Sequence, residues 1–310
     1  MKHVSFIRAL FVSAFVATAV VSCGSNSADD TSSTAVESTT VDTVVGEVDD
    51  SGSPARIVSL SPTHTEILFA IGAGEQVVAV DAMSNHPAEA AAVVTSLSGY
   101  EPNVESIVSY EPDLVVIGDD YNGLAEQLAS VGIDSWATPA PLNLDEVLAQ
   151  IEDLGERVGK LDEASELATS MRTSIDEIVA STGTLDMPLS YYHELDDTYF
   201  TATSNTCVGS VYSLFGLRNI ADAAEDQSDY PQLSAEFIIS QNPDLVFLAD
   251  TKCCAVSAES VAARPGWETL AAVQNGHVIA LDDDIASRWG PRIVDFVRFI
   301  SEAISQLVQS

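Results

Sequence analysis

The chain has 310 residues and a formal net charge of −35 at neutral pH, from 47 acidic and 12 basic residues. A surface this acidic repels nucleic-acid phosphates, so we exclude a nucleic-acid partner. The charge favours solubility and fits a saline habitat, but it identifies no ligand.

Residues 1–22 have the features of a secretory signal peptide. Lys2 and Arg8 give a basic start, and the apolar run Ala9–Val21 is too short to span a membrane comfortably. The run ends in Val20-Val21-Ser22-Cys23, which resembles a bacterial lipobox. We therefore predict an exported protein with a lipid on Cys23, held at the outer face of the cytoplasmic membrane in the periplasm or at the cell surface. An ordinary signal peptide with cleavage nearby, or an uncleaved anchor, is the alternative.

Residues 23–54 are rich in Ser, Thr, Asp, Val and Gly and have almost no large apolar side chains. They cannot bury enough surface to fold, so we predict a flexible acidic tether after the lipidated cysteine. The rest of the chain is long enough for one two-lobed protein or two domains of ordinary size.

Residues 55–142 alternate between strand and helix patterns. Strands are predicted at 56–60, 77–80, 114–117 and 135–137, and a helix begins at Ser61-Pro62 and stops at Gly72-Ala73-Gly74. This alternation is typical of a parallel sheet with crossover helices, so we predict an N-terminal α/β lobe.

One segment of this lobe recurs later in the chain at a constant spacing. NVESIVSYEPDLVVIG occupies 103–118, and LSAEFIISQNPDLVFLA occupies 233–249, so that Glu105 matches Glu236. Each copy predicts a short helix capped by Asn103 or Ser234, a proline stop and a strand buried on both faces. The repeat predicts two similar α/β lobes rather than a solenoid, and two facing lobes form a cleft where small molecules bind.

Residues 143–182 lie between the two copies and contain no proline. Apolar residues recur there at mostly three- and four-residue spacing, which predicts one long amphipathic helix, with a break near Gly155 or Gly159 as the alternative. We expect this helix to join the lobes as a stiff spine that limits their relative motion.

Residues 183–310 are predicted to form the C-terminal α/β lobe. Besides the second copy of the repeat, its predicted elements are a strand at 189–192, a helix at 211–217, a strand at 276–281 and a terminal helix at 291–308.

Three cysteines lie in this lobe: Cys207, Cys253 and Cys254. An exported domain can hold a disulfide, and adjacent cysteines bridge each other only with strain, so we predict a bridge from Cys207 to Cys253 or Cys254. A zinc site is the weaker interpretation, because no CxxC pair or nearby histidine supports it.

These motifs together resemble the periplasmic-binding-protein family that serves importers of iron chelates and vitamin B12. The resemblance is carried by RIVSLSPTHTEILFAIGAG (56–74), by both repeat copies and by DDDIASRWGPRIVDFV (282–297), and it extends from about Arg56 to the C-terminus. It implies two α/β lobes bridged by one long rigid helix, with the ligand held between the lobes.

The resemblance also implies that one exposed glutamate per lobe docks onto arginines of the membrane permease. The matching positions here are Glu105 and Glu236. Both are also predicted at the second position of a helix, where the dipole favours a carboxylate by ~0.3–1 kcal/mol. The two roles can coexist.

Ligand-binding candidates lie in loops that follow strands, because open α/β sheets bind ligands at that edge. Aromatic rings there can stack on a flat macrocycle or a catechol, and arginines can pair with ligand carboxylates or phosphate. The candidates are Ser61, Thr63, His64, Tyr100, Asp119, Asp120, Tyr121, His193, Arg288, Trp289 and Arg292.

Three of these candidates have a competing structural interpretation. His64 is equally compatible with a capping or packing histidine in the first turn of a helix. His193 lies beside Glu194, Asp196 and Asp197, which favours a solvated acidic loop, and Arg292 can pair with Asp295 or Glu302 instead of a ligand.

We therefore expect a monomeric substrate-binding protein that captures a metal chelate and delivers it to an ABC permease and its ATPase. The chelate would be a ferric siderophore or a cobalamin-type corrinoid, with haem as a third option. Few basic residues are present, which favours a neutral or mixed-charge ligand. We expect no cofactor and no resident metal.

The sequence supports two alternative functions less well. A receptor for a bare zinc or manganese ion needs several ligands facing one point, but the histidines His64, His86, His193 and His277 are scattered. A secreted hydrolase is the alternative from another class, but the sequence has no GxSxG, P-loop or HExxH motif. Ser61 and His64 lie three residues apart in a first helical turn, where side chains rarely meet productively, so we expect no catalytic residue and no enzyme.

Overall fold

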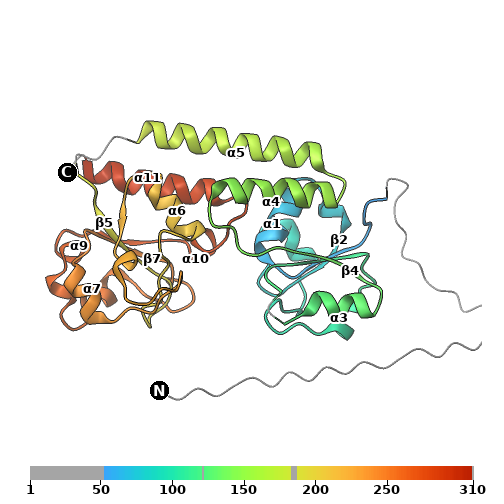
Figure 1. Cartoon of the computed structure of the whole chain (residues 1–310), viewed down its shortest axis with the longest axis horizontal. Coiled ribbons are helices and arrows are strands. Elements are labelled where there is room, and N and C mark those ends of the chain that lie inside the picture. Colours follow the sequence, from blue (N-terminus) through green and yellow to red (C-terminus); the bar gives the residue numbers. More distant parts are fainter. Residues whose placement is uncertain (1–51, 121, 183–186, 309–310) are drawn as a thin grey trace, which may run out of the picture. The chain divides into compact units, whose positions relative to one another are not determined.

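The structure is a computed structural model that describes residues 52–120, 122–182 and 187–308. The predicted signal peptide, Cys23, nearly all of the tether and Tyr121 lie outside the described residues. The described residues contain two four-stranded sheets (Figure 1), which are formed by β1–β4 and β5–β8.

Both sheets are parallel and have the same strand order. The order is β2-β1-β3-β4 in the first sheet and β6-β5-β7-β8 in the second, so each lobe places its second strand at one edge, followed by its first, third and fourth. This shared topology confirms the predicted pair of α/β lobes. The strands are β1 (Ile57–Ser59), β2 (Val77–Val80), β3 (Leu114–Ile117), β4 (Asp134–Ala137), β5 (Ser190–Glu194), β6 (Arg218–Asn219), β7 (Leu245–Leu248) and β8 (Val278–Ala280).

Helices cover both faces of each sheet, which explains why the central strands β3 and β7 are apolar and buried throughout. The described α-helices are α1 (Pro62–Ala70), α2 (Val104–Val108), α3 (Leu124–Ser130), α4 (Leu144–Arg157), α5 (Leu161–Ser181), α6 (Cys207–Ser213), α7 (Ala235–Gln241), α8 (Ala258–Ala262), α9 (Ala271–Gln274), α10 (Asp283–Ala286) and α11 (Ile293–Val308). Short 3-10 helices occupy Gly74–Gln76, Ala88–Ala92, Ala221–Ala223 and Trp267–Thr269.

The repeated segment forms the same local structure in both lobes. The side chain of Asn103 accepts a hydrogen bond from the backbone N–H of Ser106 at 2.8 Å, and that of Ser234 accepts one from Phe237 at 3.1 Å. These bonds cap α2 and α7, which lead into β3 and β7, so the predicted N-caps and buried strands are confirmed.

The aspartate that follows each repeated proline anchors the first strand of its own lobe. Oδ2 of Asp113 accepts the backbone N–H groups of Ala55 and Arg56 at 3.0 and 2.9 Å. Oδ2 of Asp244 accepts the backbone N–H and the hydroxyl of Ser190 at 2.8 and 2.7 Å. The repeated Pro-Asp pair therefore ties the start of β3 to β1, and the start of β7 to β5.

The segment between the repeats forms two helices, α4 and α5, instead of one. The break lies at residues 158–160, where Gly159 adopts φ = 74°, a left-handed conformation that glycine tolerates best. The prediction of one continuous helix is thus wrong, and the alternative break near Gly159 is confirmed. The second helix, α5, has 21 residues and packs against both α4 and α11 (Figure 1).

One hydrophobic cluster joins the two lobes. It contains Ile57 and Val116 from the first sheet, Tyr191 and Phe247 from the second, and apolar residues of α4, α5 and α11. Two smaller clusters fill the opposite faces, one beneath α2 and α3 and the other beneath α7, α8 and α9. The layer of α4, α5 and α11 is therefore part of the core of both lobes.

Candidate functional site

Most of the predicted ligand-binding residues follow a strand. Ser61 follows β1, Asp119 and Asp120 follow β3, and the segment with Arg288 and Trp289 follows β8. Because all strands of each sheet run parallel, these loops lie at the carboxyl edge of their sheet, which is where open α/β sheets bind ligands.

Ser61 and His64 contact each other at the start of α1. Oγ of Ser61 lies 2.8 Å from Nδ1 of His64, so the two side chains are in hydrogen-bond contact although they lie only three residues apart in one helical turn. His64 is fully buried and edge-on to Trp136, and burial lowers its pKa to about 4. Its Nε2 has no hydrogen-bond partner among the described residues, so no carboxylate orients the ring as in a catalytic triad. Thr63 is also nearly buried, so these residues offer little surface to a ligand.

Tyr100 and Asp120 lie close together in the first lobe but differ in exposure. The carboxylate of Asp120 accepts the backbone N–H of Leu124, the first residue of α3, at 2.6 Å. The side chain of Asn122 in the same loop donates to the backbone oxygen of Tyr100 at 3.1 Å. The ring of Tyr100 is 80% exposed, so it is available for stacking.

His193 is buried in the second lobe. Strand β5 extends through Glu194, and Nδ1 of His193 lies 2.8 Å from the hydroxyl of Tyr212. Burial lowers the pKa of His193 to about 3. The prediction of a solvated acidic loop is therefore wrong at His193, and the ring offers no surface to a ligand in this structure.

A buried acidic pair lies at the ends of β5 and β7, and sequence reasoning missed it. Both carboxylate oxygens of Glu194 accept hydrogen bonds of 2.6 Å from Arg264, whose guanidinium lies 4.6 Å from the ring centre of Trp267. Asp250 is fully buried, and neither of its oxygens has a partner among the described residues. Burial, followed by the charge of Glu194, raises the pKa of Asp250 to about 7. The only available signal was that Glu194 lies at the end of the buried strand β5 and that Asp250 follows the buried strand β7.

Arg288 and Arg292 bind a carboxylate of the other lobe. Glu66 on α1 is buried; its Oε1 accepts from Arg288 at 2.9 Å and from Arg292 at 2.6 Å, and its Oε2 accepts from Arg292 at 2.9 Å. Arg288 also donates to Asp284 and Asn85, at 2.6 and 2.8 Å. A ligand anion would have to compete with these partners.

The predicted alternative partners of Arg292 are incorrect. Its partner is Glu66, while Asp295 pairs with Arg298 at 2.6 Å. Trp289, between the two arginines, is partly buried against the core, and its Nε1 is buried with no partner among the described residues.

Two exposed apolar side chains at the strand edges were not predicted. Met83 lies in the loop after β2 and is 57% exposed. Tyr230 is 45% exposed, and its loop is fixed by backbone hydrogen bonds from Thr201 to Pro231 and from Thr203 to Asp229. Their surroundings in sequence carry no motif, which is why sequence reasoning missed them.

The two repeated glutamates lie on the surface. Glu105 is the second residue of α2 and Glu236 is the second residue of α7, and both side chains are exposed. Each lobe therefore presents one carboxylate at an equivalent place in its fold.

All three described cysteines are free thiols. Cys207 is buried in α6, whereas Cys253 and Cys254 are exposed in the loop after β7. The predicted bridge from Cys207 is therefore wrong, because its sulfur lies within the core and the other two lie at the surface.

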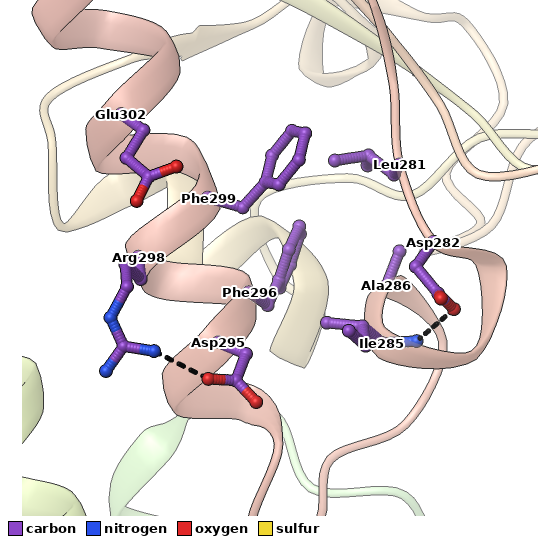
Figure 2. Close-up of a pocket in the computed structure, with 9 residues that line it drawn as sticks. All are labelled: Leu281, Asp282, Ile285, Ala286, Asp295, Phe296, Arg298, Phe299 and Glu302. Atoms are coloured by element: carbon purple, nitrogen blue, oxygen red, sulfur yellow. Dashed lines mark hydrogen bonds and ion pairs between the residues drawn. The ribbon is translucent and has the colours of Figure 1, made fainter.

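A hollow of about 250 Å³ lies between α10 and α11 (Figure 2). Its walls include Leu281, Ile285, Phe296 and Phe299. No predicted ligand-binding residue lines it, so we do not assign the ligand to this hollow.

The described residues do not meet the requirements of a metal site or of a membrane-spanning helix. Among the described residues, no three or more His, Cys, Asp or Glu side chains are grouped so that they could hold a metal ion. No helix in the described ranges combines the length and apolar character needed to cross a membrane.

Comparison with known proteins gives consistent similarities. The family described as "Periplasmic binding protein" matches residues 57–285. The chain is 30% identical over 298 residues to the ABC transporter substrate-binding lipoprotein YvrC of Bacillus subtilis (strain 168), covering 91% of each chain. It is 31% identical over 250 residues to a cobalamin-binding protein of Halobacterium salinarum (strain ATCC 29341 / DSM 671 / R1), covering 78% of this chain and 67% of that protein.

Solved structures include a similar fold. The apo form of the periplasmic heme-binding protein RhuT from Roseiflexus sp. RS-1 superposes with a TM-score of 0.73 at 25% identity, covering 81% of this chain and 98% of that chain.

Proposed function

The chain belongs to the periplasmic binding protein family, and on this basis we propose that it captures a metal chelate outside the cytoplasm and delivers it to the permease of an ABC importer. The observation that carries this proposal is the pair of exposed glutamates, Glu105 and Glu236, on equivalent helices of two lobes with one topology. Two carboxylates on duplicated elements match a partner with two positively charged sites.

The ligand is held at the carboxyl edges of the two sheets, and a corrinoid is the leading candidate. A cobalamin-binding relative supports this choice, as do the exposed Tyr100, Tyr230 and Met83, whose apolar surfaces suit a flat macrocycle. The acidic surface and the arginines bound to Glu66 disfavour a strongly anionic chelate. Haem and ferric siderophores are the next candidates, and haem is supported by the similarity to a heme-binding protein.

A thermal-shift screen identifies the ligand. At a concentration a hundred times its Kd, a ligand that binds only the folded protein stabilises it by about 2.7 kcal/mol. We expect this stabilisation with cobalamin, and a smaller one or none with haemin and ferric siderophores. No shift with any of the three classes would contradict the proposal.

Charge reversal at the two glutamates tests the delivery step. The double variant Glu105→Lys, Glu236→Lys should abolish uptake of the identified ligand by cells that carry the importer, and should leave its Kd in solution nearly unchanged. A large loss of affinity would show that the two side chains serve the ligand site or the fold instead.

A matched control separates docking from general charge effects. Glu126 on α3 and Glu259 on α8 are exposed, lie one in each lobe and also occur in the first turn of a helix. The double variant Glu126→Lys, Glu259→Lys has the same change in net charge and should transport normally. Equal loss of uptake in both double variants would contradict specific docking.

The anchor and the oligomeric state are part of the same proposal. Lipid on Cys23 would hold the protein at the outer face of the cytoplasmic membrane, with residues 23–54 as the tether. We expect a monomer by light scattering. Labelled fatty acid should be incorporated into the wild-type protein and not into Cys23→Ser.

We also propose that the protein has no catalytic activity, although Ser61 and His64 are in contact. The buried, neutral His64 lacks an orienting carboxylate, and Ser61 is itself nearly buried. Hydrolysis of generic ester or peptide substrates that disappears in Ser61→Ala would overturn this part of the proposal.

A further inference from the structure

The adjacent residues Cys253 and Cys254 have no role in the proposed transport function. Both are exposed, and their Sγ atoms lie 2.6 Å apart, in the loop between β7 and α8. We propose that this pair is a redox-modification site, at which the two neighbouring thiols form a reversible disulfide with each other.

The loop backbone is fixed just before the two thiols. The carboxylate of Asp283 accepts the backbone N–H groups of Thr251, Lys252 and Cys253 at 2.9, 2.8 and 3.0 Å. The ammonium group of Lys252 binds Asp282 and Asp284 at 2.7 and 3.0 Å. Because the backbone is already ordered, bringing the two sulfurs together costs little additional conformational entropy.

The described part of the chain offers the pair no competing thiol. Cys207 is buried in α6, and burial raises the pKa of its thiol to about 12, so it is protonated and shielded from solvent. Cys253 and Cys254 therefore react with each other, or with a reagent from outside.

The reaction needs a disulfide as the oxidant, either of a small thiol or of a protein. A thiolate of the pair attacks one sulfur of the oxidant and releases one reduced thiol, which gives a mixed disulfide. The thiolate of the second cysteine then attacks the Sγ atom of its neighbour, which breaks the mixed disulfide and releases the other reduced thiol. The two cysteines lose two protons and two electrons in total, and the oxidant gains them.

The surroundings make this oxidation depend on pH. Local desolvation, followed by the Cys254 thiol and the carboxylates of Asp283 and Asp250, raises the pKa of Cys253 to about 12. Since the thiolate is the attacking form, oxidation should become faster as the pH rises.

The resulting bond should be easy to reduce. Cα atoms of adjacent residues are about 3.8 Å apart across a trans peptide, whereas the Cα atoms of bridged cysteines are usually about 4.4–6.8 Å apart. A disulfide between neighbours is therefore strained, and strained or exposed disulfides are the labile ones. The oxidation state of the pair would therefore follow the redox conditions at the carboxyl edge of the second sheet. This does not depend on which ligand the protein binds.

The test uses the full chain, equilibrated with oxidised and reduced glutathione, alkylated and digested with trypsin. Both thiols lie in the peptide that begins at Cys253, after Lys252. Under oxidising ratios we expect this peptide to be unlabelled and lighter by two hydrogen atoms, and to take up two labels after reduction. An excess of reduced glutathione should give two labels directly.

Two variants make the result decisive. Cys207→Ser should leave the outcome unchanged, whereas Cys254→Ser should leave Cys253 alkylated or joined to glutathione. Two labels without reduction under oxidising ratios, a cross-link to Cys207, or a bond that resists an excess of reduced glutathione would each overturn the proposal. Circular dichroism of each variant checks that the fold is retained.

Discussion

Asp250 is a buried acid without a partner among the described residues, and this has a consequence for stability. Its pKa is raised from 3.8 to about 7, by burial first and by the charge of Glu194 second. The folded protein therefore keeps a proton that the unfolded chain has already released between these two pH values. Stability should fall as the pH rises through that range, and the full cost of the buried charge is present above it.

Replacing this acid with a neutral amide should remove the cost. We expect Asp250→Asn to raise the Tm at pH 8 by about 2–4 °C, the shift that ~1 kcal/mol produces in a domain of this size. The amide N–H groups can donate to the carboxylate of Glu194, which an ionised Asp250 repels. At pH 4 the Tm of the variant should be close to that of the wild type, as measured by calorimetry.

Asp197→Asn is the control, because Asp197 is exposed in the loop after β5. It should change the Tm little at either pH, since surface substitutions are usually within about 0.5 kcal/mol. If Asp250→Asn raised the Tm equally at pH 4 and at pH 8, the raised pKa of Asp250 could not be the cause of the stabilisation.

Local features were predictable for single residues, whereas distant partners were not. The caps Asn103 and Ser234 and the helix positions of Glu105 and Glu236 follow from neighbours within a few residues. The partner of Arg292 is Glu66, which lies more than two hundred residues away in the sequence. Periodicity reports which face of a helix is apolar and carries no signal of such a pairing.

At the scale of elements, the contact between α4 and α5 depends on Gly155. A Cβ atom at this position would lie 2.3 Å from Cβ of Ala164 and 2.9 Å from the backbone oxygen of Lys160. Real Cβ atoms do not approach other atoms this closely, so the two helices pack at a distance that only glycine permits.

Gly155→Ala should therefore destabilise the protein. Alanine is favoured over glycine in a helix by about 1 kcal/mol, but forcing a methyl group into a packed contact costs about 1–3 kcal/mol or more. We expect a lower urea midpoint for the variant, with a net loss of roughly 1 kcal/mol or more.

The exposed Ala149 on the same helix provides the matched control. Ala149→Gly measures helix propensity alone and should cost about 1 kcal/mol. If Gly155→Ala were as stable as the wild type or more so, the close approach of α4 and α5 would be refuted.

The sequence pattern predicts how far the helical segment extends, but it does not predict that the segment is divided into α4 and α5. The apolar period continues through residues 144–180 because α4 and α5 bury their faces in one shared cluster. The break depends on the backbone conformation of Gly159, and glycines at both 155 and 159 were compatible with it. One of these glycines ends a helix, and the other allows two helices to touch.

At the scale of the molecule, the duplication is carried by two separate sheets. The twin strands β3 and β7 each lie next to the first strand of their own lobe, and the strand orders correspond one to one. Among the links between the lobes in the described residues are the shared cluster under α4, α5 and α11 and the ion pairs of Glu66 with its two arginines. The apolar cluster can accommodate substitutions among apolar side chains, whereas the ion pairs require the carboxylate of Glu66 at its position on α1.

Removing that carboxylate's charge should weaken the whole molecule. In Glu66→Gln, the buried guanidinium group of Arg288 and the partly buried one of Arg292 would lose their shared anion, and breaking a buried ion pair by removing one partner costs about 3–5 kcal/mol. We expect a urea midpoint lower by a corresponding amount. The exposed Glu89 lines a surface hollow together with Glu66 and Arg292, and Glu89→Gln should change stability by less than about 0.5 kcal/mol. Equal, small effects of both substitutions would mean that the charge of Glu66 contributes little to holding the lobes together.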